Sequence, residues 1–313
     1  MTLIFFKLIF IVYLLHNSIS IMRLKNIALY VFLLFTAITP STAWAAKIDS
    51  LDIPGVALHK TYKAAVVLPS SYAKNKLSYP VLYLLHGGFG HYRDWIDKTP
   101  EKDVVARLAD QHNIIIVLPE GEVFSYYIDS PVDKGSQFES YIIKDVIPAI
   151  DKAYRTNQSA SARAITGLSM GGYGALYLST RHPDLFCAAG SMSGALNPDM
   201  MTWKLPPEPT ANIKKAFAAI MGPIESVDYS IYSVIAMADV MKRNGTRLIF
   251  DCGVDDFLIE PNRELHRRLL FNQTPHDYSE RPGTHSWEYW QNSLPYHLVF
   301  FAEVFKTNKT QVN

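Results

Sequence analysis

Two patterns of apolar residues alternate along this chain. Continuous apolar runs of strand length occur at residues 79–85, 113–118 and 247–252, which is typical of strands buried on both faces of a parallel sheet. Residues 104–112 and 137–154 instead carry apolar side chains at helical spacing. Because strands alternate with helices, the pattern predicts an α/β fold with a mostly parallel central sheet flanked by helices.

The remaining segments continue the alternation. We expect one or two opening strands at 56–68, and further strands before Ser169, at 185–192 and at 276–281. A proline-rich loop is expected at 197–212, and helices at 213–221, 229–244, 262–271 and 286–305. No internal repeat or domain-sized linker interrupts the sequence, so it predicts a single domain over residues 46–313.

Two apolar stretches precede this domain. Residues 22–45 have a basic start, an apolar run and an Ala-Trp-Ala site, which predicts a secretory signal peptide cleaved after Ala45. Residues 1–21 approach the length of a membrane helix. Two consecutive export segments would be redundant, so we interpret Met22 as the true start and expect a periplasmic or secreted protein rather than a membrane-anchored one.

Composition narrows the classes of partner. The 313 residues are 49% hydrophobic and 19% charged, which suits a protein with a substantial core. Residues 1–45 hold three basic and no acidic residues, so their removal leaves 27 basic residues against 29 acidic ones. Such a balance does not suggest nucleic acid or an anionic membrane as partner.

The two cysteines are expected to be buried thiols. Cys187 is placed at the start of one strand and Cys252 at the end of another, too far apart along neighbouring strands to bridge. Neither has a cysteine or histidine neighbour at a zinc-ligand spacing. We therefore expect no metal site and no cofactor.

The segment 162–176, ARAITGLSMGGYGAL, is the centre of the candidate chemistry. It predicts a short strand, the tight turn Gly-Leu-Ser-Met-Gly around Ser169, and the start of a helix rich in small residues. GxSxG alone is a weak pattern, but this strand–turn–helix context is the one that a nucleophile elbow requires. Ser169 would present its hydroxyl at a helix N-terminus, so the segment predicts Ser169 as a nucleophile.

A serine nucleophile needs a base to take its proton and an acid to orient that base. His285 lies just beyond the strand at 276–281, where the ends of parallel strands meet, so it is the predicted base. Two other histidines lie inside predicted elements and are weaker candidates, His276 and His297. For the acid we favour one residue of the turn after strand 247–252, Asp256, with two alternatives, Asp255 and Asp251.

An acyl-transfer site also needs donors for the oxyanion. One is expected to be the backbone N–H of Met170, the residue after the nucleophile. The second should come from the His-Gly-Gly-Phe-Gly loop after strand 79–85. We favour Gly88, with Gly87 and Phe89 as alternatives.

Four motifs together resemble one branch of the α/β-hydrolases: YLLHGGFG, ITGLSMGGYGAL, DCGVDDFL and PGTHSWEYW. This esterase D / S-formylglutathione hydrolase-like branch includes tributyrin-type acetyl esterases, feruloyl and acetylxylan esterases, and mycolyltransferases. The resemblance extends from about residue 56 to residue 305. It implies a catalytic triad of Ser169, Asp256 and His285, with oxyanion N–H groups from Gly88 and Met170. It also implies a catalytic domain without a bound metal and without a large lid domain. The HGGFG loop is most similar to the acetyl-esterase type.

We therefore expect an exported serine carboxylesterase that acts on short-chain, acetyl-type esters. The alternatives are a carbohydrate or feruloyl esterase, an S-formylglutathione hydrolase-like thioesterase, a mycolyltransferase-type acyltransferase, and an inactive binding protein on the same scaffold. The expected partner is a small-molecule or carbohydrate ester, and the oligomeric state is left open. Loop aromatics are expected to contact the substrate. We favour Trp95, Tyr127 and Trp203, with Tyr92 and Tyr126 as further candidates.

Overall fold

The structure, a computed structural model, describes residues 46–312 and is built on a single eight-stranded sheet. The strand order is β1-β2-β4-β3-β5-β6-β7-β8, with β1, β2 and β4 joined antiparallel and the strands from β4 to β8 parallel. This confirms the predicted α/β fold with its mostly parallel sheet. The proposed export region, including the cleavage site after Ala45, lies outside the described residues.

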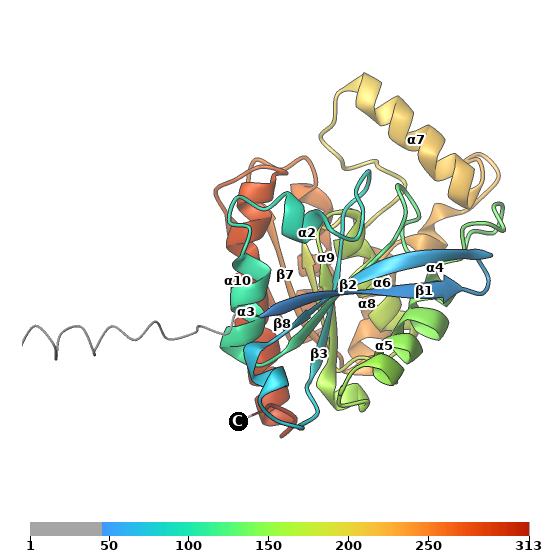
Figure 1. The fold of residues 1–313 in the computed structure, drawn as a ribbon. Helices are drawn as coiled ribbons and strands as arrows, with labels where there is room; N and C mark the ends of the chain where they lie inside the picture. Colours follow the sequence, from blue (N-terminus) through green and yellow to red (C-terminus); the bar gives the residue numbers. More distant parts are fainter. Residues whose placement is uncertain (1–45, 313) are drawn as a thin grey trace, which may run out of the picture. The chain divides into compact units, whose positions relative to one another are not determined.

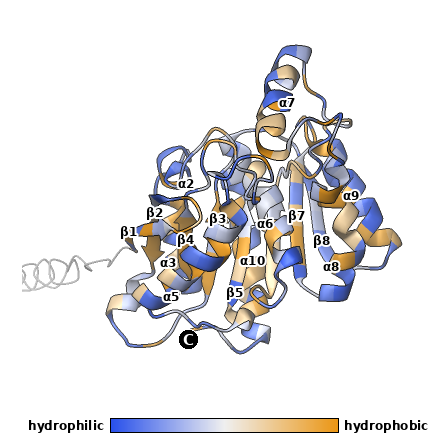
Figure 2. Ribbon diagram, turned by 90° about the vertical axis from the view of Figure 1, so that its right-hand side faces the viewer, coloured by the Kyte–Doolittle hydropathy of each residue, from blue (hydrophilic) through white to orange (hydrophobic). Residues whose placement is uncertain are grey.

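The strands that carry the core are short and apolar. β3, β4, β5 and β6 are buried at every position, as expected for strands covered on both faces. The eight strands are β1 (Lys47–Gly55), β2 (Lys60–Leu68), β3 (Val81–Leu85), β4 (Ile115–Pro119), β5 (Arg163–Gly167), β6 (Ala188–Met192), β7 (Arg247–Gly253) and β8 (His276–Arg281). Figure 2 shows the apolar strands enclosed by helices with polar outer faces.

Helices cover both faces of the sheet (Figure 1). α3 and α10 pack on one face in one hydrophobic cluster, while α5, α6, α8 and α9 pack on the other in a second cluster. The helices are α2 (Asp94–Asp97), α3 (Val104–His112), α4 (Phe138–Ser140), α5 (Ile147–Ala153), α6 (Met170–Arg181), α7 (Pro207–Met221), α8 (Ala238–Asn244), α9 (Ile259–Phe271) and α10 (Trp287–Thr307). No helix within residues 46–312 is long and apolar enough to span a membrane.

Four elements differ from the sequence-based expectation. The helix predicted at 229–244 is α-helical only in α8 (Ala238–Asn244), which follows two 3-10 turns, η4 (Tyr229–Tyr232) and η5 (Ile235–Met237). The opening hairpin starts at Lys47 and not at residue 56. The sequence pattern missed β1 because it is an edge strand with many polar, solvent-facing positions. α7 starts at Pro207 inside the predicted loop, since proline at the first helical position loses no hydrogen bond. The helix predicted at 137–154 is divided by a π-helical turn, η2 (Tyr141–Val146), between α4 and α5.

Both cysteines are free thiols, as expected. Cys252 is buried on β7, but Cys187 is only partly buried just before β6, so the expectation of two buried thiols is wrong for Cys187. Among residues 46–312 no group of three or more histidine, cysteine, aspartate or glutamate side chains could hold a metal ion.

Candidate active site

Ser169 lies in a sharp turn between β5 and α6. Its backbone has φ 53° and ψ −116°, a conformation that is strained for a residue with a side chain. The turn is possible because Gly167 and Gly171 have no β-carbon, for which the neighbouring backbone leaves no room. A β-carbon on Gly171 would lie 2.6 Å from the carbonyl oxygen of His86, and one on Gly167 would lie 2.6 Å from the carbonyl oxygen of Gly171.

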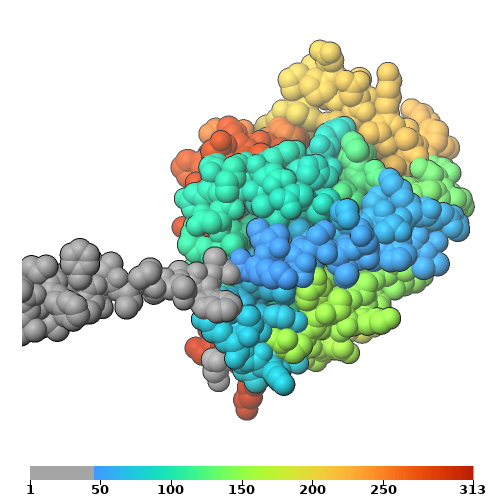
Figure 3. Space-filling view, viewed as in Figure 1, coloured from blue at the N-terminus to red at the C-terminus, as the bar shows by residue number. Residues whose placement is uncertain are grey.

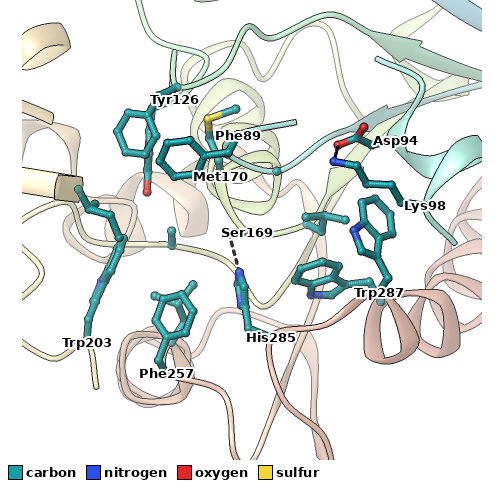
Figure 4. Close-up of a pocket in the computed structure, with 18 residues that line it drawn as sticks. Phe89, Asp94, Lys98, Tyr126, Ser169, Met170, Trp203, Phe257, His285 and Trp287 are labelled. Carbon is teal, nitrogen blue, oxygen red and sulfur yellow. Dashed lines mark hydrogen bonds and ion pairs between the residues drawn. The ribbon is translucent and has the colours of Figure 1, made fainter. Parts of the chain in front are cut away.

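His285 joins this serine to a buried carboxylate. Its Nε2 lies 2.9 Å from the Ser169 Oγ, and its Nδ1 lies 2.9 Å from Oδ2 of Asp256 and 3.1 Å from Oδ1. The Asp256 side chain is fully buried, and its Oδ1 also accepts the Leu258 N–H at 2.9 Å. The carboxylate favours the tautomer with the proton on Nδ1, which leaves Nε2 free to accept the serine proton. Figure 4 shows the contact between Ser169 and His285.

A close approach of two loops brings Asp256 and His285 together. A β-carbon on Gly253, at the end of β7, would lie 2.3 Å from the carbonyl oxygen of Gly283, which follows β8. Of the three candidate aspartates in this described region, Asp256 is the one that contacts His285. Asp255 is exposed, and Asp251 is paired with His297 of α10.

The glycine loop after β3 and the start of α6 both line the cavity at Ser169. The Phe89 N–H donates to the carbonyl of Val123 at 2.6 Å, which removes Phe89 from the candidate oxyanion donors. The N–H groups of Gly88 and Met170 have no acceptor within residues 46–312, and neither does that of Gly87. A β-carbon on Gly88 would lie 3.9 Å from that of Met170. The Met170 N–H belongs to the first turn of α6, whose dipole favours negative charge.

His86 connects the glycine loop (residues 87–90) to the loop after β4 through hydrogen bonds of its imidazole. The imidazole accepts the Gly121 N–H on Nε2 at 2.8 Å, so its Nδ1–H donates to the carbonyl of Gly87, also at 2.8 Å. Glu120 fixes the next loop by accepting the N–H groups of Tyr92 and Glu122. Burial raises the pKa of Glu120, but the neighbouring His86 and the hydrogen bonds from these N–H groups outweigh burial and hold the pKa below its usual value.

A cavity of about 220 Å³ opens at Ser169. One end is apolar and aromatic, with walls from Phe124, Tyr126, Trp203, Ile213 and Phe257. The other end carries Asp94, Lys98, Trp287 and Trp290. Ser169 and His285 lie between the two ends in Figure 4, so an ester bound at the serine would have a different environment on each side. Helix α7, which contributes Ile213, projects at the top of Figure 3 (gold).

Of the three predicted substrate contacts, Trp203 lines the cavity and the other two do not. Trp95 is fully buried, donates its indole N–H to the carbonyl of Leu85 at 3.0 Å, and packs edge-on against Trp287. Tyr127 is also fully buried, and its hydroxyl donates to the carbonyl of His86 at 3.1 Å. We therefore correct both predictions: Trp95 and Tyr127 lie behind the cavity wall and support it.

Tyr126, a further candidate in the sequence analysis, lines the cavity, and several other lining residues were missed. Tyr126 and Tyr127 both have positive φ, 52° and 56°, and of the two it is Tyr126 that lines the cavity (Figure 4). Phe257 and Trp287 could have been found, because they follow Asp256 and His285 closely in sequence. Lys98 gave no signal, since an exposed lysine one turn after Asp94 is typical of any surface helix.

Known proteins are similar to this chain in sequence and in fold. Residues 55–301 match the family described as "Putative esterase". An acetyl esterase of Caldicellulosiruptor saccharolyticus is 29% identical over 232 residues, covering 71% of this chain and 83% of that protein. A solved ferulic acid esterase is 30% identical with a TM-score of 0.71, covering 84% of this chain and 99% of that one. An S-formylglutathione hydrolase from Staphylococcus aureus, 20% identical, has the same fold with a TM-score of 0.69, covering 82% of this chain and 99% of that one.

The family match extends over most of the chain, from the opening hairpin into α10. The similarity to the ferulic acid esterase and the S-formylglutathione hydrolase likewise covers more than four fifths of this chain. The resemblance noted in the sequence is therefore confirmed at the level of the family and its fold. The chain belongs to this Esterase family of α/β-hydrolase fold and is a serine carboxylic ester hydrolase.

Proposed function

We propose that this enzyme hydrolyses short-chain acyl esters through a triad of Ser169, His285 and Asp256. The observation that supports this assignment most strongly is the continuous hydrogen-bonded chain from the Ser169 hydroxyl through the imidazole to a buried carboxylate. Each link has the length of an ordinary hydrogen bond. The arrangement provides a nucleophile, a general base and an orienting acid in the order that acyl transfer requires.

The proposed reaction has two halves. Ser169 Oγ attacks the ester carbonyl while His285 Nε2 takes its proton, and Asp256 stabilises the resulting imidazolium. The developing oxyanion accepts the N–H groups of Met170 and Gly88. His285 then returns the proton to the departing alcohol. Water, activated by the same imidazole, releases the acid from the acyl-serine and restores the enzyme.

The size of the cavity supports a short acyl group. About 220 Å³ is shared between two ends, and the apolar end is lined by the rings of Phe124, Tyr126 and Trp203. A long alkyl chain would have to leave this end past α7. We therefore propose a preference for acetyl-type esters over long-chain ones.

An aromatic acyl group is the second candidate. Trp203 and Phe257 face each other with ring centroids 6.0 Å apart in the apolar wall, and a planar phenolic acyl group could pack against either ring. The solved relative that is 30% identical is a ferulic acid esterase. This candidate uses the same triad and differs only in the acyl group.

Initial rates on a series of p-nitrophenyl esters from acetate to palmitate, with methyl ferulate alongside, test these assignments. We expect the highest kcat/KM on acetate or butyrate and loss of turnover in Ser169→Ala, with the circular dichroism spectrum unchanged. Ser50→Ala, on the exposed edge strand, is the matched control and should keep full activity. Activity retained by Ser169→Ala would refute the triad, whereas a ferulate preference would favour the second candidate.

We also propose that the enzyme is exported through residues 22–45. The basic start, apolar run and Ala-Trp-Ala site of this segment support the proposal. Expression of the full chain in a secreting bacterial host, followed by N-terminal sequencing of the exported protein, tests it. A mature N-terminus at Ala46 is expected, whereas an uncleaved chain retained in the cells would contradict export.

A further inference from the structure

The last strand of the sheet, β8, has one free edge. It stands at the end of the strand order, opposite β1 in Figure 2, and among residues 46–312 it pairs only with β7. The Val254 N–H donates to the carbonyl of Arg281, so every second residue back from Arg281 directs its backbone groups toward β7. The backbone groups that point away from the sheet are those of the alternate residues, His276, Tyr278 and Glu280. Such an edge can pair with a strand of another chain.

The two edges of the sheet differ in how their charges are paired. On β1, Asp49 is paired with Lys47, and Asp52 is paired with Lys63 of β2. On β8, Asp277 is exposed, and its carboxylate has no ion pair or hydrogen bond in the part of the chain that the structure describes. An unpaired charge opposes indiscriminate pairing at an edge, but it favours a strand that brings a cation opposite it.

A second copy of β8 brings such a cation. If two copies pair antiparallel about a two-fold axis through Ser279, Tyr278 of one lies opposite Glu280 of the other, and both residues direct their backbone groups outward. The same axis places Asp277 opposite Arg281 of the second copy, and symmetry makes this contact twice. An axis through Asp277 or Glu280 would bring like charges together, and one through Tyr278 would leave Asp277 opposite Ser279. The charge pattern therefore favours the axis through Ser279.

Arg281 is held in place for this contact. Its guanidinium contacts Asp251 and Ser293, and it lies over the ring of Tyr296 at 4.7 Å from the centroid. The side chain is still 25% exposed, and it lies on the same face of β8 as Asp277, because residues two apart along a strand share a face. A side chain that is already ordered loses little conformational entropy when it pairs across an interface.

Exposed apolar side chains flank the free edge on both sides. A groove of about 220 Å³ lies between β8 and α10, and Tyr296 and Val299 of α10 line it while remaining 59% and 58% exposed. On the α9 side, Leu270 is exposed one turn after His266, whose Nδ1 lies 2.8 Å from Nε2 of His276 on β8. Pairing of two edges would remove part of this apolar surface from water.

We propose that the free edge of β8 is a homodimer interface, in which two copies of this chain pair antiparallel about a two-fold axis through Ser279. The sheets of the two copies then form one continuous sheet. The two contacts between Asp277 and Arg281 fix the register, and Tyr296 and Val299 of each copy pack against the other. No residue of β8 lines the catalytic cavity, so the proposal does not depend on the proposed function.

Disulfide cross-linking tests the register. On the axis, residue 279 of each copy forms a pair without hydrogen bonds, with α-carbons about 4.5 Å apart, which is within the range of a disulfide. Ser279→Cys should therefore give a linked dimer on a non-reducing gel after mild oxidation. Asp277→Cys is the matched control, since residue 277 would lie about 13 Å from its own counterpart. Absence of a cross-link in Ser279→Cys, or equal cross-linking in both variants, would overturn the proposal.

Sedimentation equilibrium of the purified protein measures the dimer itself. We expect Asp277→Lys, which brings like charges together twice, and Val299→Lys each to raise the dimer Kd by about tenfold, with kcat/KM on p-nitrophenyl acetate unchanged. Asp184→Lys is the control, because Asp184 is also exposed but lies outside β8, α9 and α10, and its Kd should equal that of the parent. A parent that is monomeric at micromolar concentrations, or a Kd unchanged in both variants, would overturn the interface.

Discussion

The carboxylate of Asp251 accepts a hydrogen bond from Nε2 of His297 at 2.9 Å, and both side chains are excluded from solvent. This pair connects β7 to α10, the helix that starts two residues after His285. Three further side chains complete the network, namely Ser293, Arg281 and Thr166. A buried ion-pair network therefore fixes the helix that begins just after the proposed base, His285.

Removal of the Asp251 charge should destabilise the protein. Asp251→Asn keeps the size of the side chain but leaves Arg281 and His297 without their carboxylate. Breaking a buried pair from one side costs about 3–5 kcal/mol, so we expect a loss of about that size in the free energy of unfolding, measured in urea. Asp52→Asn is the control, because Asp52 pairs with Lys63 on the exposed edge and its loss should leave the midpoint unchanged. Equal midpoints for the two variants would contradict the structural role of the network.

The same carboxylate should contribute to acid unfolding. Burial raises the pKa of Asp251, but the contacts with His297, Arg281 and Ser293 outweigh it and hold the pKa below the usual value. The unfolded chain then binds the proton more tightly than the folded one, so this stabilisation is complete above the unfolded value of about 4 and is lost as the pH falls below it. Unfolding midpoints between pH 3 and 7 should decline on the acid side, and less steeply in Asp251→Asn. A parallel decline in the variant would exclude Asp251 as a source.

Substitution by alanine should have different effects at two glycines near Ser169. Gly171→Ala places a β-carbon 2.6 Å from the backbone oxygen of His86, so the elbow must shift and both stability and turnover should fall. Gly88→Ala meets its nearest atom at 3.6 Å, an ordinary contact, and keeps the proposed donor N–H, so turnover should persist. Thermal unfolding and kcat on p-nitrophenyl acetate measure both effects. A fully active Gly171→Ala would show that the turn tolerates a side chain.

Both thiols should be slow to react in the folded protein. Burial raises the pKa of Cys187 to about 11 and raises that of Cys252 as well, so little thiolate exists at pH 8. We expect alkylation by iodoacetamide to proceed slowly until denaturant is added, after which two thiols titrate. Rapid labelling of Cys187 at pH 8 in the native state would contradict this environment.

The sequence was most informative about the candidate site where backbone geometry restricts which residues can stand at a position. Gly167 and Gly171 mark the turn around Ser169 because no other residue fits there, and His285 and Asp256 follow parallel strands whose ends must meet. The same rules predicted the sheet from its apolar strands.

Side-chain direction in the loops could not be predicted in this way. Tyr126 and Tyr127 are neighbours in the same left-handed turn, yet Tyr126 lines the cavity while Tyr127 is buried under the glycine loop. The buried position of Tyr127 depends on Gly121 and Gly174, where a β-carbon would lie 2.4 Å from its ring, and Gly174 is far from Tyr127 in sequence. Likewise the Trp95 side chain points inward, where its indole N–H donates a hydrogen bond to the carbonyl of Leu85. The sequence pattern gives no sign of this partner.

Trapping of the acyl-enzyme tests the role of Ser169 most directly. The enzyme is mixed with p-nitrophenyl acetate, quenched in acid during the burst of p-nitrophenol release, digested, and examined by peptide mass spectrometry. We predict one acetyl group per chain, located on Ser169 and missing in Ser169→Ala. An acetyl group that accumulates on another residue, or a burst that persists in Ser169→Ala, would contradict the proposed mechanism.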